Sequence, residues 1–331
     1  MRQLPRQTDP NVLVGFETSD DAGVYLIDPQ TALVQTVDFF TPIVDDPRTF
    51  GEVAAANSLS DVYAMGGRPI SALSIVGFPE KGEPEILAQI LQGGLAKMME
   101  AKCTVIGGHS IRSEDVLFGY AVTGLINPKR VWKNVGALAA DALLFTKPLG
   151  TGVISTALKN DKAKDEWVRA SIRSMRTLNR AAAEALHEIE AQEKWHDAIH
   201  SVTDVTGFGL LGHAREMALG NPKKGIQPVS LEIDHLAFNY LPGALDAAEA
   251  GQIPGGLKNN REFVGECVEF APSVSQEHRH LLFDPQTSGG LLVSIAAAAV
   301  ADALAALERY GVQASRVGSA LAKKSPLIQV K

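Results

Sequence analysis

The sequence contains few cysteines, and none in a spacing typical of metal or redox sites. Its two cysteines, Cys103 and Cys267, cannot form a disulfide framework, and neither stands in a Cys-x-x-Cys or Cys/His cluster. Both stand among apolar residues, which favours buried, inert thiols over reactive ones. This cysteine usage predicts a reducing, cytoplasmic location.

Long apolar runs and runs of basic residues are also missing. The richest apolar stretch, residues 291–307, is interrupted by Ser294 and Asp302, so no membrane span is expected. The first six residues contain no apolar segment of the kind found in secretory signals. The net charge of −7, without a Lys/Arg run, argues against nucleic acid as a partner. A protein this acidic needs metal ions or local cations if it handles phosphates.

The remaining composition is that of a globular protein of about two domains. The chain has 331 residues, of which 45% are apolar and 21% are charged. Strand-like and helix-like patterns occur in both halves, and the character of the sequence changes near residue 147. We therefore expect a mixed α/β or α+β fold with one domain at residues 1–146 and a second at residues 147–331.

Hydrophobic periodicity predicts the elements of both domains. In the first domain it indicates strands at residues 24–27, 32–37, 70–76, 103–106, 116–126 and 142–146, and helices at residues 49–65 and 83–101. In the second it indicates one long helix at residues 165–190, further helices at residues 208–218 and 296–310, strands near residues 198–202, 229–233 and 290–295, and two short strands at the end.

Aspartates stand beside expected turns or strand ends in four short segments. Mg²⁺ takes oxygen ligands and typically binds through a few carboxylates together with substrate phosphates, so Asp20, Asp21, Asp38, Asp61 and Asp204 are suitable ligands for a nucleotide–metal site. Asp20, Asp21 and Asp204 could equally form turns or helix N-caps. Asp61 falls inside an expected helix, where no cap is needed, although a solvent-exposed face would also explain it.

Gly107, Gly108 and His109 follow the expected strand at residues 103–106. Two glycines after a strand allow backbone N–H groups to approach a phosphate closely, and His109 could donate to it. A tight turn with an incidental histidine is the alternative.

The sequence lacks a P-loop but contains one match to Gly-x-Gly-x-x-Gly, at residues 207–212. Taken alone, with Glu232 downstream, the match indicates a dinucleotide site. A dinucleotide fingerprint belongs to an early strand–turn–helix, whereas this match comes two-thirds of the way along the chain. The glycines are more consistent with a helix that starts tightly against a strand.

Together these segments resemble the selenophosphate synthetase (selenide, water dikinase) family, within the ATP-binding superfamily that includes aminoimidazole ribonucleotide synthetase and a hydrogenase maturation protein. The resemblance runs from about Asp9 to the C-terminus. It rests on eight segments in order, of which residues 203–213 and 284–290 are the most specific: residues 9–15 (DPNVLVG), 17–22 (ETSDDA), 36–40 (TVDFF), 60–67 (SDVYAMGG), 107–110 (GGHS), 146–150 (TKPLG), 203–213 (TDVTGFGLLGH) and 284–290 (DPQTSGG).

The resemblance implies an enzyme that converts ATP, selenide and water to selenophosphate, AMP and phosphate. It implies two α/β domains of the aminoimidazole ribonucleotide synthetase type, the first pairing its sheet with that of a second copy to form a dimeric β-barrel. It also implies Mg²⁺, with K⁺ as a further cation. The implied Mg²⁺ ligands are Asp21, Asp61 and Asp204, and the implied ATP-binding residues are Thr18, Ser19, Asp20, Asp38, Asp61, Gly107, Gly108 and His109.

One family feature has no counterpart in the sequence. The family begins with a glycine-rich segment that bears a Cys or selenocysteine and, shortly after, a Lys. Here no Cys or Lys precedes Asp9, and the first lysine is Lys81. We therefore expect no catalytic nucleophile among these residues and an impaired turnover. The alternatives are a non-catalytic ATP-binding homologue and a sister ATP-dependent enzyme of the same superfamily.

Overall fold

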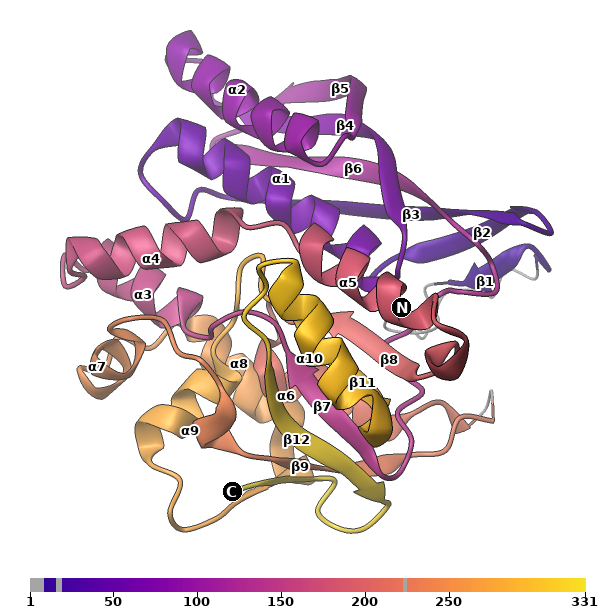
Figure 1. Ribbon diagram of the computed structural model, residues 1–331. Coiled ribbons are helices and arrows are strands. Elements are labelled where there is room, and N and C mark those ends of the chain that lie inside the picture. Colours follow the sequence, from indigo (N-terminus) through magenta and orange to yellow (C-terminus); the bar gives the residue numbers. More distant parts are fainter. Residues whose placement is uncertain (1–8, 16–19, 223–224) are drawn as a thin grey trace. The chain divides into compact units, whose positions relative to one another are not determined.

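The computed structural model describes residues 9–15, 20–222 and 225–331, and it divides into two compact units (Figure 1). Unit 1 comprises Met1–Val131 with Arg176–Arg180, and unit 2 comprises Trp132–Met175 with Ala181–Lys331. Each unit holds one mixed sheet and its own helices, so the expected mixed α/β architecture is confirmed. The domain boundary after residue 146 stays a prediction about where the chain folds independently.

Unit 1 is a six-stranded sheet with two helices. Its strand order is β1-β2-β3-β6-β4-β5, and every neighbouring pair is antiparallel except β4 and β5. Within the residues that the structure describes, this sheet is open and does not close into a barrel. The elements are β1 (Val12–Val14), β2 (Gly23–Asp28), β3 (Thr31–Phe40), α1 (Pro47–Ala64), β4 (Arg68–Phe78), α2 (Pro84–Glu100), β5 (Thr104–Arg112) and β6 (Leu117–Ile126).

The helix α1 begins with a capped N-terminus and packs closely against α2. Asp46 caps it by accepting a 2.7 Å hydrogen bond from the Thr49 backbone, and Pro47 occupies the first turn. A Cβ on Gly51 would lie 2.0 Å from the Ile90 carbonyl oxygen of α2. A Cβ on Gly93 would lie 2.0 Å from the Arg48 carbonyl oxygen. The two helices can approach this closely because glycine stands at both positions.

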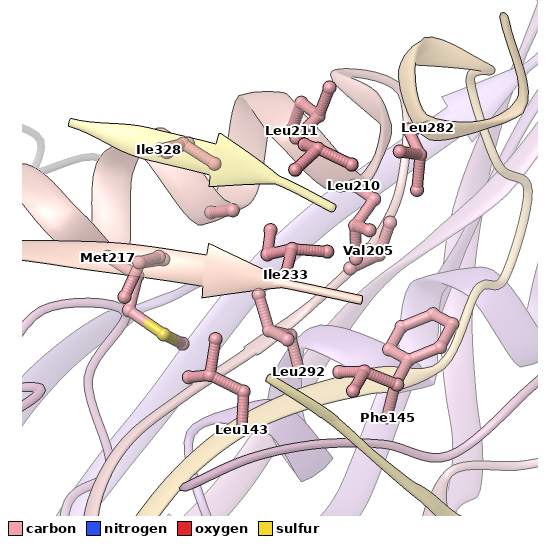
Figure 2. Close-up of a cluster of buried hydrophobic side chains, with 14 of the residues drawn as sticks. Leu143, Phe145, Val205, Leu210, Leu211, Met217, Ile233, Leu282, Leu292 and Ile328 are labelled. Atoms are coloured by element: carbon pink, nitrogen blue, oxygen red, sulfur yellow. The ribbon is translucent and has the colours of Figure 1, made fainter. Parts of the chain in front are cut away.

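Unit 2 is built on a seven-stranded sheet with the order β10-β13-β9-β12-β7-β11-β8. Figure 2 shows side chains of its core, in which Leu143 and Phe145 of β7 belong to the same cluster as Leu210 and Leu211 of α6. The elements are β7 (Asp141–Phe145), α3 (Thr151–Lys159), α4 (Asp165–Arg176), α5 (Arg180–Glu190), β8 (Ile199–Asp204), α6 (Gly209–Leu219), β9 (Val229–Ile233), α7 (Ala244–Glu249), α8 (Gly255–Val264), β10 (Val268–Phe270), α9 (Gln276–Phe283), β11 (Leu291–Ala296), α10 (Val300–Arg309), β12 (Ser315–Ala322) and β13 (Ile328–Val330). In the described part of the chain, no helix combines the length and the apolar character that crossing a membrane requires.

The single helix expected at residues 165–190 is wrong, because α4 and α5 are separate helices. Thr177 and Asn179, which have low helix propensity, stand between them. The buried Asn179 amide donates a 2.8 Å hydrogen bond to the Ser60 hydroxyl, and Arg180 donates to the Glu100 carbonyl at 3.1 Å. These contacts lie within unit 1, to which residues 176–180 belong, and hydrophobic periodicity does not report them.

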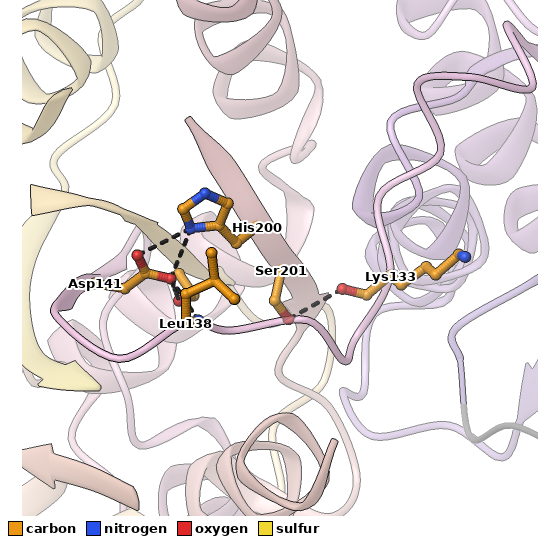
Figure 3. Close-up of polar contacts among 6 residues, drawn as sticks. Lys133, Leu138, Asp141, His200 and Ser201 are labelled. Carbon is orange, nitrogen blue, oxygen red and sulfur yellow. Dashed lines mark hydrogen bonds and ion pairs between the residues drawn. The ribbon is translucent and has the colours of Figure 1, made fainter. Parts of the chain in front are cut away.

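Hydrogen bonds join residues 132–141 to β8 and β11 (Figure 3). This segment leads into the sheet of unit 2. The Lys133 carbonyl accepts hydrogen bonds from the Ser201 hydroxyl at 3.0 Å and from the backbone of β8. The buried Asp141 carboxylate accepts from Ser294 at 2.7 Å and from His200 Nδ1 at 2.8 Å. The hydrogen bond that His200 donates to Asp141 raises the pKa of His200, although burial opposes this change. Folding therefore makes the charged form of His200 more favourable than it is in the unfolded chain.

We expect His200→Gln to remove a pH-dependent part of the stability. Because folding raises the His200 pKa, this contribution is present below the unfolded pKa of about 6.5 and is lost as the pH rises through the folded value. Urea unfolding at pH 6 should show a loss of roughly 1–2 kcal/mol, as for a hydrogen bond to a charged group, and the difference should shrink at higher pH.

His196→Gln is the matched control, because His196 pairs with Asp197 at 2.9 Å on the surface. It should change the free energy of unfolding by less than about 0.5 kcal/mol. An equal, pH-independent effect of both substitutions would contradict the assignment of the ion pair.

Candidate functional site

Two carboxylates of unit 1 are held by a pair of matched contacts between β3 and α1. The Thr36 hydroxyl donates to Asp61 at 2.5 Å, and the Asn57 amide donates to Asp38. Thr36 and Asp38 are two residues apart on a strand, an advance of about 6.8 Å, while Asn57 and Asp61 are four apart on a helix, an advance of about 6 Å. The two spacings agree, so α1 running opposite to β3 can make both contacts.

The environment of Asp38 leaves its charge only partly compensated. Burial raises its pKa, while donation from the Phe39 backbone and from the Asn57 amide lowers it. Ser58 fixes the strand beneath by donating to the Asp38 carbonyl at 2.9 Å and by accepting from the Tyr120 backbone at 3.2 Å. Asp38 is therefore a positioned, half-buried carboxylate whose named partners are neutral.

The other residues expected to bind the metal or the nucleotide in unit 1 precede β2 in the sequence. Thr18 and Ser19 lie outside the described residues, and Asp20 and Asp21 are partly buried just before Gly23. Gly23 pairs with Gln35 in the antiparallel β2–β3 pair. This register directs the segment with Asp21 toward the half of β3 that carries Thr36 and Asp38.

The interpretation of residues 107–109 as a turn after a strand is wrong. They lie within the edge strand β5, which continues to Arg112. The pairing with β4 jumps from Val105 to Gly107, so Ile106 is the extra residue of a β-bulge. The bulge keeps the chain extended where two glycines suggested a reversal.

The cross-strand register places Gly108 and His109 on opposite faces of the sheet. Gly108 is in a row with Ser74, Tyr120 and Asp38, on the face that α1 covers. Three strand spacings separate it from Asp38, about 14 Å. His109 is in a row with Ile75, Gly119 and Phe39, on the other face. One subunit therefore does not bring His109 and Asp38 together.

Asp204 is the last residue of β8 and is 1% exposed. The loop after it is held by His213, whose Nε2 accepts a 3.1 Å hydrogen bond from the Thr206 backbone and whose Nδ1 contacts the Thr203 hydroxyl at 3.3 Å. Burial lowers the pKa of His213 to about 4, so the imidazole is neutral near pH 7. β8 is an edge strand that pairs antiparallel with β11, so residues 207–212 do not open a Rossmann unit.

Gln286 and Asp284 cap the N-terminus of α3 from a distant part of the sequence. The Gln286 carbonyl oxygen accepts from the Gly150 and Thr151 backbones, at 3.0 and 3.2 Å, and from the Thr151 hydroxyl. The Asp284 carboxylate accepts from Gly152 and Val153, at 2.9 and 3.2 Å. The Gln286 amide also donates to Asp284 at 2.9 Å, and its backbone N–H donates to the Thr206 carbonyl at 3.0 Å.

Burial dominates the electrostatics of this capping pair. Asp284 is completely buried, and burial raises its pKa to about 7 in spite of the hydrogen bonds from Val153, Gln286 and Gly152. Its second oxygen, Oδ1, is buried and has no hydrogen-bond partner in the described part of the chain. Burial therefore brings the pKa of this carboxyl group into the neutral range.

Lys147 completes what we call the junction, formed by residues 146–153, 203–213 and 284–291. Its buried ammonium group donates to the Ser288 carbonyl at 2.7 Å. The Leu291 backbone donates to the Thr146 hydroxyl at 2.8 Å, and a Cβ on Gly289 would lie 1.8 Å from the Val205 carbonyl oxygen. Three segments that are distant in the sequence thus meet in one polar junction at the end of β8.

The described residues do not by themselves assemble a metal centre. Among them, no group of three or more His, Cys, Asp or Glu side chains is placed to hold an ion. Asp21 and Asp61 belong to unit 1 and Asp204 to unit 2, so their joint role as ligands stays a prediction. The sequence interpretation gave no role to Thr36, Asn57, His213 and Gln286, although the spacings of Thr36–Asp38 and Asn57–Asp61 carry a signal for the first two.

Comparison with known proteins gives relatives that match over most of the chain. Residues 19–126 match the family model AIR synthase related protein, N-terminal domain, and residues 139–331 match the corresponding C-terminal domain. The chain is 44% identical over 315 residues to a selenide, water dikinase of Pelobacter propionicus, covering 95% of this chain and 86% of the relative. It is 46% identical over 323 residues to one of Desulfitobacterium hafniense, covering 97% and 90%.

Solved structures share the fold at low sequence identity. A ThiL protein complexed with AMPPCP and TMP superposes with a TM-score of 0.65 at 19% identity, covering 94% of this chain and 87% of that one. HypE of E. coli, a hydrogenase maturation protein, gives 0.62 at 17% identity, covering 90% and 82%. At these identities the likeness concerns the fold alone.

We expect Gln286→Glu to destabilise the protein in a pH-dependent way. The substitution keeps the acceptor for Gly150 and Thr151 but places a second carboxyl group against Asp284. Two carboxyl groups at this distance cannot both ionise, so stability is retained at low pH and is lost as the pH rises through about 7. Urea unfolding should show a loss of about 3 kcal/mol at pH 8 and a smaller loss at pH 5.5.

Gln252→Glu is the matched control, because Gln252 bonds Asn160 at the surface. It should change stability by less than about 0.5 kcal/mol at either pH. A pH-independent effect of Gln286→Glu would refute the close contact between its side chain and Asp284.

Proposed function

The chain belongs to the selenide, water dikinase family of AIR synthase related proteins, and from this we propose that it uses ATP, selenide and water to make selenophosphate, AMP and phosphate. The observation that carries the proposal is the identity of 44–46% over 95–97% of the chain to selenide, water dikinases. The two most specific signature segments, residues 203–213 and 284–290, also meet in the junction.

The carboxylates of unit 1 suit Mg²⁺ in chemistry. Asp61 offers carboxylate oxygens, the ligand type that Mg²⁺ prefers, and the Thr36 hydroxyl orients it. Asp38, oriented by the Asn57 amide, stands beside it as a second acidic group. When bound, Mg²⁺ would supply charge neutralisation for the ATP phosphates.

The chain's own residues would then position the reactants. We propose that Asp21, Asp61 and Asp204 hold the metal, and that Thr18, Ser19, Asp20, Asp38, Gly107, Gly108 and His109 contact the nucleotide. The nucleotide analogue AMPPCP in the ThiL complex supports nucleotide binding by this fold. The junction would set the position of Asp204, because Gln286 and His213 both bond the Thr206 backbone two residues later. A role for K⁺ and a cytoplasmic location remain proposals that rest on the resemblance.

We propose further that the chain works as a homodimer through the sheet face that α1 and α2 do not cover. Val37 and Phe39 of β3 and Leu73 of β4 stand on this face and are 57%, 46% and 45% exposed. His109 shares the face, so we propose that its contact with the nucleotide is made at this interface and not beside Asp38 of the same chain. A β-barrel made by two sheets would also remove the open edge at β5.

Calorimetry should show that ATP binds far more tightly with Mg²⁺ than without it. Asp61→Asn keeps an acceptor for the Thr36 hydroxyl but removes the negative charge. Asp204→Asn likewise removes the charge of the carboxylate at the end of β8. Each should weaken Mg·ATP at least about tenfold and change metal-free binding little. Any AMP formation should require selenide.

Asp45→Asn, at an exposed position before α1, is the control and should bind Mg·ATP like the parent. Unchanged Mg·ATP affinity in both Asp61→Asn and Asp204→Asn would refute the metal assignment. Tight binding of NADH in place of ATP would refute the function.

Val37→Lys should dissociate the dimer, because it places an ammonium group in the middle of the proposed interface. Sedimentation velocity should show a dissociation constant at least about tenfold higher than that of the parent. Leu236→Lys is the control, since Leu236 of unit 2 is 71% exposed and should leave the dimer intact. A monomeric parent protein at micromolar concentration would contradict the proposal.

A further inference from the structure

Unit 2 carries an open hollow formed by α8, α9 and the turn after α7. Its volume is about 820 Å³, within the range of small-molecule sites. Ile253 and Leu257 supply its apolar wall, and Lys258, Arg261 and His280 supply its nitrogen atoms. All of its lining residues lie outside the junction, so the hollow is separate from the residues assigned to the proposed reaction.

The two cationic side chains of the hollow lack an ion-pair partner among the residues that the structure describes. Lys258 and Arg261 are three residues apart on α8, so they stand on the same side of the helix. Neither forms an ion pair or side-chain hydrogen bond within the described ranges, whereas Lys194 and Lys331 each pair with a carboxylate at 2.6 Å. The hollow therefore holds two exposed cations and one carboxylate, that of Glu262, four residues after Lys258 on the same helix.

His280 adds a third nitrogen atom without a partner. The Gln276 amide nitrogen lies 2.8 Å from His280 Nε2 and donates to it, so the proton of the neutral ring is on Nδ1. Nδ1 is buried and has no hydrogen-bond partner among the described residues. Burial and the charge of Arg261 both lower the pKa of His280. Nδ1 has almost no accessible surface, so an anionic oxygen in the hollow would reach this unpaired donor only after the His280 ring turns toward it.

We propose that this hollow binds a small organic phosphate monoester. Arg261 offers the planar donor pair that matches phosphate oxygens, Lys258 adds a point charge, and the ring N–H of His280 adds a neutral donor. Ile253 and Leu257 would contact the organic part, which a bare phosphate ion lacks. Glu262, also in the lining, disfavours ligands with a second anionic group beside it.

The test uses the full chain and NMR of its histidine ring protons, with phenyl phosphate as the probe. A bound phosphate monoester stabilises the imidazolium, so the His280 pKa should rise on titration. His278, two residues away, packs against His235 and Tyr240 and should change little. Inorganic phosphate should give a weaker effect than phenyl phosphate, and sodium chloride at matched ionic strength should give none. His280→Gln identifies the resonance.

Arg261→Gln should weaken phenyl phosphate about tenfold, the loss expected for one charge-assisted hydrogen bond. Arg316→Gln, an exposed change on β12, is the control and should bind like the parent. A His280 response no larger than that in sodium chloride would overturn the proposal. Equal responses to inorganic and phenyl phosphate would contradict the proposal that the ligand has an organic part. Parent-like binding by Arg261→Gln would contradict the proposal that the phosphate binds in this hollow.

Discussion

The hydrogen bonds of the Gln286 side chain hold the polar junction of unit 2 together. Its carbonyl oxygen accepts from the first turn of α3, and its amide nitrogen donates to the Asp284 carbonyl and carboxylate. Its backbone reaches Thr206, just beyond Asp204. Because all these groups are buried, each would lose water without gaining a partner if the amide were displaced. One residue thereby fixes segments more than 130 positions apart in the sequence.

Unit 1 uses a different device to hold acidic side chains. The contacts of Thr36 with Asp61 and of Asn57 with Asp38 orient two carboxylates through neutral side chains. The cost of partial burial appears in the raised pKa of Asp38. Partial burial makes a carboxylate charge unfavourable, and a bound cation would offset this cost. The positions of the carboxylates would therefore help to set the affinity for the cation.

The sequence predicted the mixed α/β fold and most long elements, because apolar periodicity reflects burial directly. It failed at Thr177 and Asn179, where tertiary hydrogen bonds end a helix, and at Ile106, where a bulge continues a strand through two glycines. It located Asp38 and Asp61 but could not identify Asn57 and Thr36 as their partners, since the relative direction of β3 and α1 decides that pairing. The role of Gln286 depends on contacts with distant segments, which local patterns do not contain.

The close packing of α1 on α2 has a consequence for protein engineering. Replacing a helical glycine by alanine is a common route to higher thermal stability, because alanine gains up to about 1 kcal/mol in helix propensity. At Gly51 and Gly93 the added methyl group would overlap a carbonyl oxygen of the neighbouring helix. Consensus or propensity-guided redesign of this chain should therefore leave both glycines unchanged, and natural variation at these two positions should be narrow.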